Sequence, residues 1–521
     1  MSVVNKSLLI AALSAGTMLA GCNLAPKYVR PVGAVPVTLP QGGAYPAAAT
    51  DARDITAIGW RDFFLDPRLR QVVDMGLANN RDLRVAAANV LQARAQYRVQ
   101  RSNIVPTTTV SGTGIYTNNI FGAAGASGGG TGGTGAGTGA GTGGGTGTGG
   151  GTGTGGGSGG TGAGVGTGQQ SSNIEAYAVN AGFSNFELDL FGRLRNLNRA
   201  AQEQVLASEE AQRSTRISLI AEIASAWLTM ASDQEQLRLS QETLKTFQQT
   251  FDLTQAQFRI GVGSELEVRQ AETNYQSARN DIAALRTTIA RDQNALNLLV
   301  GTTVPATMLP GELGGETYTL DSLPSDLSSQ ALLRRPDVLQ AEHQLLAENA
   351  NIGAARAAFF PTISLTATLG TISTALSGLF NGGSFTYNAS PAAALPLFDG
   401  GRRRGNLDYA RASEQVAVAT YEKTIQTAFR EVADALAQRG TIGEQVSAQS
   451  ARANAARVAA RLSDARFRAG VDSFLTTLDA QRTAYAAEQT LVGARLTRAS
   501  NTVELYRALG GGLQDETTPP R

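Results

Sequence analysis

The chain has 521 residues, a formal net charge of +1, 6% aromatic residues, one cysteine and one histidine. A balanced charge gives no general attraction to nucleic acid, so we expect no nucleic-acid partner. The single histidine, His343, leaves no material for histidine-based metal clusters or for Ser-His and Cys-His catalysis. The 43 acidic residues include possible carboxylate pairs for hydrolysis, but no pocket-forming domain is visible to hold them. We therefore expect neither an enzyme nor a metal or other cofactor.

Residues 1–21 have the pattern of a secretory signal peptide. Lys6 precedes the apolar run 8–13, and small residues lead to Cys22, the sole cysteine. The stretch Leu-Ala-Gly-Cys22 resembles the cleavage box of bacterial lipoproteins, so Cys22 is the expected acylated residue of a chain anchored in outer-membrane lipid. Asn23 in place of Asp favours the outer membrane under the lipoprotein sorting pattern. The alternative is an ordinary signal peptide in which Cys22 is incidental.

Residues 22–80 are expected to form a lipidated, extended lead-in that ends in a short helix. From Asp82 an apolar residue recurs at every seventh position until Pro106 ends the helix. The same pattern runs from Asp337 to Pro361, shifted by 255 residues, and indicates packing against other helices in a coiled-coil manner. The heptad residues are Leu83, Val90, Tyr97 and Ile104 in the first copy and Val338, Leu345, Ile352 and Phe359 in the second.

Polar and apolar residues alternate after each of these prolines. Thr362–Leu369 alternate over eight residues, which is typical of a strand with one wet and one apolar face. The partner strand is expected within Ser384–Phe398. Thr107–Phe121 and Glu175–Phe191 take the same places in the first copy, so one chain supplies four amphipathic strands.

The two turns between these strands differ greatly in length. Residues 122–168 are a low-complexity Gly/Thr run that cannot pack a core, and we expect a disordered external loop. Its chance matches to G-x-G-x-x-G do not lead from a strand into a helix, so nucleotide binding receives no support.

The longest helix is expected where the chain lacks helix breakers. Leu194–Ile260 contains neither Gly nor Pro and spans about 100 Å if continuous, at about 1.5 Å per residue. Ser264–Val300 is the expected returning helix. In the second copy we expect local kinks or breaks at Gly440, Gly443 and Gly493. No segment after the signal approaches 18 uncharged apolar residues, so no transmembrane helix is expected.

Two matching stretches mark the junctions of the long helices. Phe258–Ala271 and Phe467–Arg482 share a Phe, a Gly-Val pair and a Ser at the same spacing, 209 residues apart. In each copy a helix stops at Gly and Ser starts the next helix, which predicts the tip of a helical hairpin. The chain is therefore a helix–strand–strand–helix–helix unit written twice. The expected parts are repeat 1 in residues 81–300, a connector in 301–334, repeat 2 in 335–510 and a flexible tail in 511–521.

Four strands cannot close a membrane barrel. Closure needs at least about eight strands, because every strand edge must be paired in lipid. Several chains must therefore contribute to one barrel, and the expected fold class is an α+β membrane protein.

A family resemblance rests on motifs that occur in order and partly in duplicate. These motifs are Trp60, Phe63-Phe64, Asp66-Pro67, Asn80–Leu83, Phe360–Thr362, Leu397–Arg402 and Phe467–Arg482. Together they resemble the TolC-like outer-membrane efflux proteins, in particular the lipoprotein branch that serves multidrug efflux pumps. The resemblance implies a homotrimer whose twelve-stranded β-barrel is continued by a long α-helical periplasmic tube. It also implies a passive exit duct for drugs or other small molecules, served by a periplasmic adaptor (membrane fusion) protein and a proton-driven inner-membrane pump.

The resemblance further implies functional residues at the hairpin tips. In the family, carboxylates that face the pore close the tube near the tips, and Asp479 matches one such position. Glu267 is at an equivalent place in the first copy, and Asp472 stands where some relatives carry a bridging Arg. We expect a pore gate at Asp472, Asp479 and Glu267, with bonding unlike that of those relatives; the alternative is that they are solvated tip residues. The expected adaptor-contacting residues are Gly261, Val262, Ser264, Gly470, Val471 and Ser473.

Two other functions remain open at this point. The exit duct of a type I protein-secretion system has the same fold. A lipid-anchored periplasmic coiled-coil scaffold without a pore belongs to a different class, and the alternating strands argue against it because such a scaffold has no use for them.

Overall fold

The computed structural model describes residues 23–31, 33–36, 38–46, 58–117, 174–313, 318–320 and 329–511. They divide into two compact units. The helical unit takes in the described residues up to 101, 190–360 and those from 397 onward; the sheet unit takes in those of 102–189 and 361–396. The expected signal peptide, Cys22, the Gly/Thr run 122–168 and residues 512–521 lie outside the described residues.

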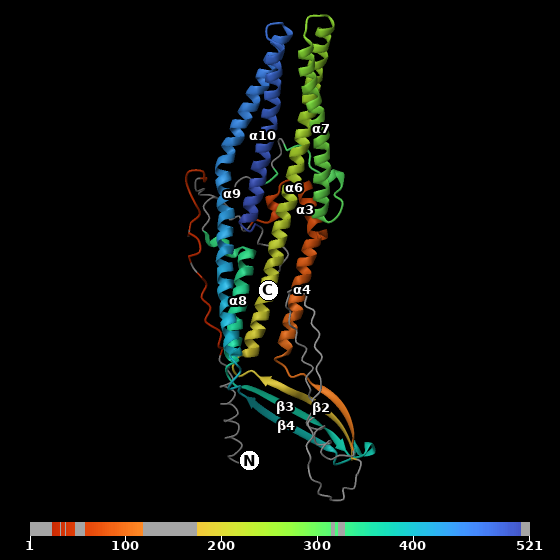
Figure 1. The fold of residues 1–521 in the computed structure, drawn as a ribbon, viewed down its shortest axis with the longest axis vertical. Helices are drawn as coiled ribbons and strands as arrows, with labels where there is room; N and C mark the ends of the chain where they lie inside the picture. Colours follow the sequence, from red (N-terminus) through yellow and green to blue (C-terminus); the bar gives the residue numbers. More distant parts are fainter. Residues whose placement is uncertain are drawn as a thin grey trace, which may run out of the picture. The chain divides into compact units, whose positions relative to one another are not determined.

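The helical unit contains the same three helix lengths twice (Figure 1). α4 (Arg81–Ser102) and α8 (Pro336–Ala357) have 22 residues each, α6 (Arg193–Arg259) and α9 (Arg402–Arg468) have 67 each, and α7 (Glu265–Val300) and α10 (Phe474–Ala508) have 36 and 35. The short helices α2 (Trp60–Phe63) and α3 (Pro67–Asn79) precede α4, and the 3-10 helices η2 (Ala306–Met308) and η3 (Ser329–Arg334) lie between α7 and α8. The duplication seen in the sequence is therefore a duplication of elements.

Several of the motif residues start helices. The Asp66 carboxylate accepts the backbone N–H groups of Arg68 and Leu69 at 2.6 and 3.3 Å, and Pro67 occupies the first helical position of α3. Before α9, the Asp399 carboxylate accepts the N–H groups of Gly401 and Arg403 at 3.1 and 3.2 Å. Gly401 precedes the helix with a φ of 90°, a conformation that glycine adopts without strain.

The breaks expected at Gly440, Gly443 and Gly493 do not occur, because α9 and α10 run through these positions without interruption. Gly440 has a packing role instead. A Cβ at this position would lie 2.0 Å from the carbonyl oxygen of Ala44, so the N-terminal segment crosses α9 where α9 has no side chain. At Gly443 a Cβ would meet nothing within 4 Å. Tertiary packing along the whole helix thus overrides the low helix propensity of glycine.

Two apolar clusters form the main core of the helical unit. In the first, Trp227 is fully buried and lies with Phe63, Phe64, Tyr318 and Tyr506. Phe63 stacks on Tyr506 with ring centroids 4.0 Å apart, and the Trp227 indole donates to the Met308 carbonyl at 3.2 Å. The Trp60–Phe64 motif is therefore part of this core.

The second cluster contains the heptad residues of α8. Val338 and Leu345 are buried with Tyr421, Ile425 and other residues of α9. The heptad pattern holds less well at the ends and in the first copy: Phe359 is 41% exposed, and Val90 is the one member of its stripe that is buried.

The N-terminal strap (residues 23–31, 33–36 and 38–46) lies against α8 and α9. Its Tyr28 hydroxyl and Arg30 guanidinium donate to the buried Glu342 carboxylate, at 3.0 Å and at 2.9 and 2.7 Å. Burial and the neighbouring Glu342 raise the pKa of Tyr28 above its usual range. Leu39 joins the second apolar cluster. The expected extended lead-in is thus fixed to the helices by buried polar and apolar contacts.

The sheet unit is one antiparallel sheet in the order β1-β2-β3-β4. Its strands are β1 (Thr109–Thr117), β2 (Ile174–Leu188), β3 (Thr362–Ser373) and β4 (Phe385–Ala394). β2 of the first repeat pairs with β3 of the second, so both repeats share one sheet. β1 and β4, at the two edges, each have one partner strand in the described chain.

The register gathers most of the large apolar side chains on one face of the sheet, with Ile115 and Ile372 on the other. Leu369, for example, lies opposite Ala181 on one side and Tyr387 on the other, so these side chains share a face. A bulge between Phe183 and Phe186, with Asn185 at a φ of 57°, keeps both phenylalanines on that face. The apolar face contains Val110, Tyr116, Tyr177, Val179, Ala181, Phe183, Phe186, Leu188, Ile363, Leu365, Ala367, Leu369, Phe385, Tyr387, Ala389, Pro391 and Ala393. The opposite face is rich in Thr, Ser and Asn.

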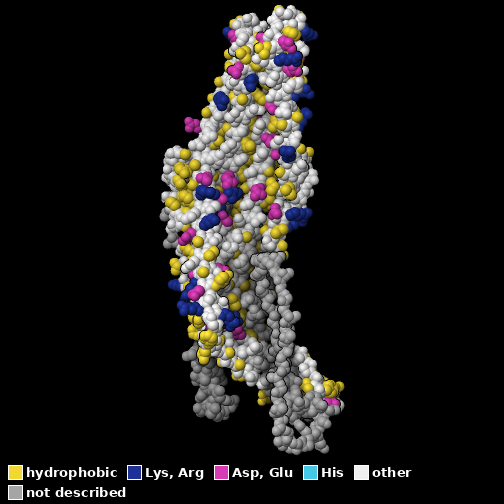
Figure 2. All heavy atoms as spheres, in the orientation of Figure 1, with side chains coloured by type: hydrophobic (Ala, Val, Ile, Leu, Met, Phe, Trp, Pro, Cys, Tyr) yellow, Lys and Arg dark blue, Asp and Glu magenta, His cyan; other side chains and the backbone are white. Residues whose placement is uncertain are grey.

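Among the described residues, no helix has the length and apolar character needed to span a membrane. The visible face of the helical unit carries charges of both signs intermixed with apolar side chains (Figure 2), in keeping with the net charge of +1.

Candidate functional site at the helical hairpin tips

The first tip joins α6 to α7 through a tight turn. Gly261 adopts a φ of 81°, and the N–H of Val262 donates to the Gln257 carbonyl at 3.0 Å. Ser264 caps α7 in a capping box: its hydroxyl accepts the Glu267 N–H at 3.3 Å, and the Glu267 carboxylate accepts the Ser264 N–H at 2.9 Å. Glu267 therefore has a structural role at the start of α7.

The second tip joins α9 to α10 with the same backbone turn and a different brace. Gly470 has a φ of 73°, and the Val471 N–H donates to the Arg466 carbonyl at 2.9 Å. Ser473 caps α10 by accepting the Thr476 N–H at 3.4 Å. The Arg466 guanidinium donates two hydrogen bonds to the Asp472 carboxylate, both at 2.8 Å.

The two tips are thus stabilised by different polar interactions. Thr476 occupies the place of Glu267, so the second tip lacks the capping-box acid. The first tip has Gln257 and Gly263 where the second has Arg466 and Asp472, so it lacks the ion pair. The first turn is thus stabilised by a capping box at the start of α7, and the second by an ion pair between the end of α9 and the turn.

The ion pair defines the charge state of Asp472. Its hydrogen bonds with Arg466 hold the pKa of Asp472 below the usual value for Asp. The brace is therefore present at neutral pH and is lost as the pH falls through this lowered pKa. Because both groups are at the surface, we regard the brace as a restraint on turn geometry and not as a source of global stability.

The three predicted gate carboxylates have different local environments within one chain. Asp472 pairs with Arg466, Glu267 caps α7, and Asp479 is an exposed residue in the second turn of α10. No ion pair or hydrogen bond engages Asp479 in the part of the chain that the structure describes. Of the three carboxylates, Asp479 is therefore the one that stabilises neither a turn nor a helix end in the described structure. The gate formed by all three stays a prediction.

The tips expose large apolar side chains next to the predicted adaptor-contacting residues. Apolar residues of this size are costly to expose on two neighbouring turns unless a partner covers them. The exposed fractions lie between 61% and 75% for Ile260, Val262, Leu266, Val471 and Leu475.

Behind the tips, a small apolar cluster joins the two hairpins. Ala271 of α7 is buried with Phe474 and Leu478 of α10, and Phe251 and Phe467 pack against them. The rings of Phe467 and Phe474 lie 5.6 Å apart. This cluster fixes α10 close to the first hairpin near the tips.

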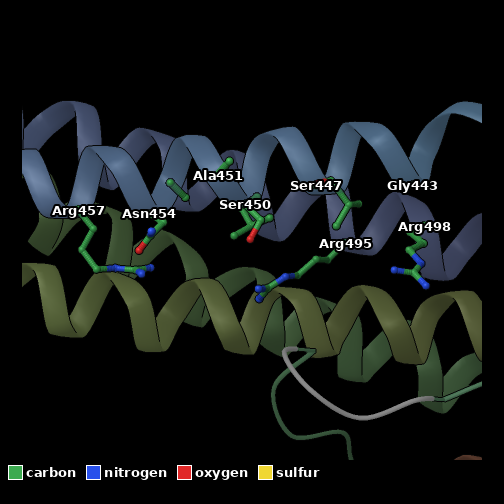
Figure 3. A pocket seen from close by; sticks show the side chains of 11 residues that line it. Gly443, Ser447, Ser450, Ala451, Asn454, Arg457, Arg495 and Arg498 are labelled. Carbon is green, nitrogen blue, oxygen red and sulfur yellow. The ribbon is translucent and has the colours of Figure 1, made fainter.

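A groove of about 680 Å³ lies farther along α9 and α10 and is lined by three arginines, Arg457, Arg495 and Arg498 (Figure 3). Arg457 pairs with Glu488 at 2.6 Å, and Arg495 pairs with Glu235 at 3.1 Å. Arg498 also has a partner. Because its cations are compensated, we do not assign the groove to an anionic ligand. The described residues contain no group of three or more His, Cys, Asp or Glu side chains that could hold a metal ion.

Sequence reasoning located both turns but missed three features of the site. It missed Arg466 as the partner of Asp472, although a cation six residues before an acid across a glycine turn is a usable signal. It missed the capping role of Glu267, which the Ser-x-x-Glu spacing indicates. It also missed Ile260, Leu266 and Leu475, which extend the apolar tip surface beyond the predicted residues.

Comparison with known proteins shows the class to which this fold belongs. The model of the outer membrane efflux protein family matches residues 72–302 and 327–511. The probable efflux pump outer membrane protein TtgC of Pseudomonas putida is 42% identical over 517 residues, covering 99% of this chain and 97% of that protein. The outer membrane protein OprJ of Pseudomonas aeruginosa is 38% identical over 506 residues, covering 97% and 96%. The open state of the MtrE outer membrane channel of Neisseria gonorrhoeae superposes with a TM-score of 0.78 at 34% identity, covering 96% of this chain and all (100%) of that one.

The chain belongs to the outer membrane efflux protein family. Its similarity to TolC-like channels, expected from the motifs, is confirmed, and the family role is transport and not catalysis. The chain is accordingly an outer-membrane protein of an efflux pump.

Proposed function

We propose that this chain forms the outer-membrane channel of a tripartite efflux system, as a passive exit duct for drugs or other small molecules. The observation that carries the proposal is the four-stranded sheet, with one apolar face, one polar face and two edge strands that each have one partner in the described part of the chain. An apolar face suits lipid and a Thr- and Ser-rich face suits a water-filled lumen. Free edges are not tolerated in lipid, so further strands must complete the wall.

The missing strands come from other copies of the chain. Pairing β4 of one copy with β1 of the next closes the sheet without new elements. Three copies give a twelve-stranded barrel, and the number three follows from the family resemblance. A homotrimer is therefore the proposed functional state.

The helical unit gives independent support for a second copy. α8 packs against both long helices, α6 and α9, and twelve of its 22 residues are buried. Its counterpart α4 lies beside α6, to which the Arg94–Glu209 ion pair links it, and only two of its 22 residues are buried (Figure 1). By the repeat symmetry, the place beside α4 belongs to an α9, and we assign it to the α9 of a neighbouring subunit.

The hairpin tips are the proposed contact with the periplasmic adaptor. Five apolar side chains are exposed there, around the predicted contact residues Gly261, Val262, Ser264, Gly470, Val471 and Ser473. Burial of such side chains by a partner is worth about 25 cal/mol per Å². Through the adaptor the channel receives cargo from an inner-membrane pump. The family resemblance implies that this pump is proton-driven.

Lipid anchoring at Cys22 fits the position of the strap. The carbonyl of Leu24 accepts a hydrogen bond from Arg356 of α8 at 3.1 Å, and a Cβ at Gly353 would lie 2.8 Å from the Ala25 nitrogen. Leu24, two residues after Cys22 in the sequence, is therefore fixed near the end of α8. An acyl chain there adds a membrane anchor to the barrel, with the helices extending into the periplasm.

Of the two alternatives, the scaffold without a pore leaves the apolar sheet face without a role. A type I secretion duct shares every element used above, but the relatives reported are outer membrane proteins of efflux pumps.

The proposal is tested with purified protein in planar bilayers and with drug susceptibility in cells that hold the cognate adaptor and pump. We expect ion-conducting pores, and the double variant Val262→Asp with Val471→Asp should conduct normally but fail to restore resistance. An unpaired charge in an apolar interface costs about 2 kcal/mol or more, which is about a 30-fold loss of adaptor affinity. Val29→Asp, at an equally exposed residue of the strap, is the matched control and should restore resistance. Protein that inserts into bilayers without conducting contradicts the channel function.

A further inference from the structure

The seam between the two hairpins of one chain is polar along its middle part, between two apolar clusters. α10 of the second hairpin runs beside α6 of the first (Figure 1). At one end of the seam α6 and α10 share the large apolar cluster that contains Trp227 and Val503, and at the tips Phe474 and Leu478 pack against Ala271 of α7. Between these two clusters, hydrogen bonds and an ion pair cross the seam. The pairs are Arg495 with Glu235 at 3.1 Å, Tyr485 with Ser240 at 2.8 Å and Gln481 with Thr250 at 3.2 Å.

Tyr485 differs from the other two because it reaches both helices of the first hairpin. Its hydroxyl lies 2.8 Å from Ser240 Oγ on α6 and 3.0 Å from Asp281 Oδ2 on α7. Its ring meets the edge of Phe247 of α6, with centroids 6.3 Å apart. One side chain of α10 thus connects three helices.

The protons available on these groups decide which of them donates each hydrogen bond. A carboxylate only accepts, so the Tyr485 hydroxyl donates to Asp281, and its oxygen then competes with the Gln236 carbonyl for the single Ser240 proton. Ser240 also lies 2.8 Å from the carbonyl of Gln236 in its own helix, so it has a second acceptor available. Burial raises the pKa of Tyr485 to about 12, so the hydroxyl stays protonated and remains a donor at neutral pH.

We propose that Tyr485 is a positioning residue that holds α10 against α6 and α7 and so, together with the apolar cluster of Ala271, Phe474 and Leu478, sets the distance between the two hairpin tips of each chain. An apolar seam loses its burial when its helices part, whereas polar pairs can exchange their partners for water at a net cost of about 1 kcal/mol each. The polar middle of the seam therefore resists separation less than the apolar clusters at its two ends do. Tyr485 is the contact there that ties both helices of one hairpin to the other.

The inference rests on the proposed channel function for its consequence. If the tips surround the periplasmic entrance of a pore, their separation controls the width of that entrance. The structural claim itself concerns one chain and can be tested independently.

The hydroxyl can be removed without disturbing the fold. In Tyr485→Phe the ring contact with Phe247 remains, Ser240 donates to Gln236, and the partly exposed Asp281 is hydrated. Asp281→Ala removes the same connection from the other side. Asp281→Asn keeps an acceptor oxygen for Tyr485 and is the conservative variant. Tyr409→Phe, at an exposed tyrosine of α9, is the control.

The test measures the distance between spin labels at Val262→Cys and Val471→Cys in the full chain with Cys22→Ser, assembled with an excess of unlabelled chain. In Tyr485→Phe and in Asp281→Ala we expect the population at long distances to rise about fivefold, which corresponds to about 1 kcal/mol. The double variant should resemble either single one, because both remove the same bond. Asp281→Asn and Tyr409→Phe should match the parent, with unchanged thermal stability of the assembly throughout.

Two outcomes overturn the inference: an unchanged distance distribution in Tyr485→Phe, or additive effects of the two substitutions. Planar-bilayer recordings on the same variants separate this inference from the channel function. Conducting pores with unchanged distances refute the role of Tyr485 alone. Changed distances in protein that never conducts refute the channel function and leave the positioning role intact.

Discussion

At the scale of single residues, the carboxylates of the hairpin tips are of two kinds. Some stabilise the turns, and one is exposed and available to line the proposed pore. Asp472 is engaged by Arg466 and Glu267 by the N-terminus of α7. Asp479, one turn farther along α10, is exposed and is the carboxylate best suited to a pore ring. The family resemblance had placed all three in one expected gate.

This distinction predicts different effects for two otherwise similar substitutions. Three copies of Asp479 near a trimer axis would repel one another and attract cations. Asp479→Ala should therefore lower cation selectivity and weaken cation block in planar-bilayer recordings. Asp472→Ala should change selectivity much less, because its charge is already compensated by Arg466.

Assembled Asp479→Ala channels with the selectivity of the parent would leave Asp479 as an ordinary solvated charge. A larger effect from Asp472→Ala than from Asp479→Ala would reverse the assignment.

The residue types at the tips were readable in the sequence because glycine and serine have strong local preferences at helix ends. The partner of Asp472 was missed although the spacing of Arg466 and Asp472 across the glycine turn was visible, because such a pair forms only when the turn has the geometry seen here. Tyr485 was not found either, since its two partners are more than 200 residues away in the chain.

At the scale of elements, Gly440 and Gly443 show that one residue type can have opposite roles within one turn of a helix. Both lie inside the continuous α9. A side chain at Gly440 would collide with the backbone of Ala44 in the strap, whereas a side chain at Gly443 has open space.

We predict opposite outcomes for Gly440→Ala and Gly443→Ala. At Gly443 the substitution should raise stability by about 0.5–1 kcal/mol, because alanine favours a helix over glycine. At Gly440 the methyl group should displace the strap and increase protease cleavage within residues 38–46. Thermal unfolding and limited proteolysis on the two variants provide the comparison. Equal cleavage of the strap in both would show that Gly440 has no packing role.

Helix lengths and strand positions followed from the sequence, because heptads, alternation and breaker residues are local signals. The course of the strap did not, because its contacts with Glu342 and Gly440 join segments hundreds of residues apart. The breaks expected from helix propensity failed for the same reason: packing along the helix decided the outcome.

At the scale of the whole molecule, several features of the single chain are incomplete. In the described chain each edge strand of the sheet has one partner, α4 has two buried residues where α8 has twelve, and both tips expose apolar side chains. In the assembly that we propose, additional copies complete the first two and an adaptor covers the third. The sequence predicted the need for several chains from strand number alone, and the number three came from the family resemblance.

The central claim is therefore that the chain functions as an assembly. The most direct test is the native mass of the folded protein extracted in mild detergent, determined together with the mass of the unfolded chain. We predict a mass of three chains, resistant to dilution, because edge pairing and the packing of α4 against α9 both require neighbouring copies. A stable, folded monomer in that measurement would contradict the channel.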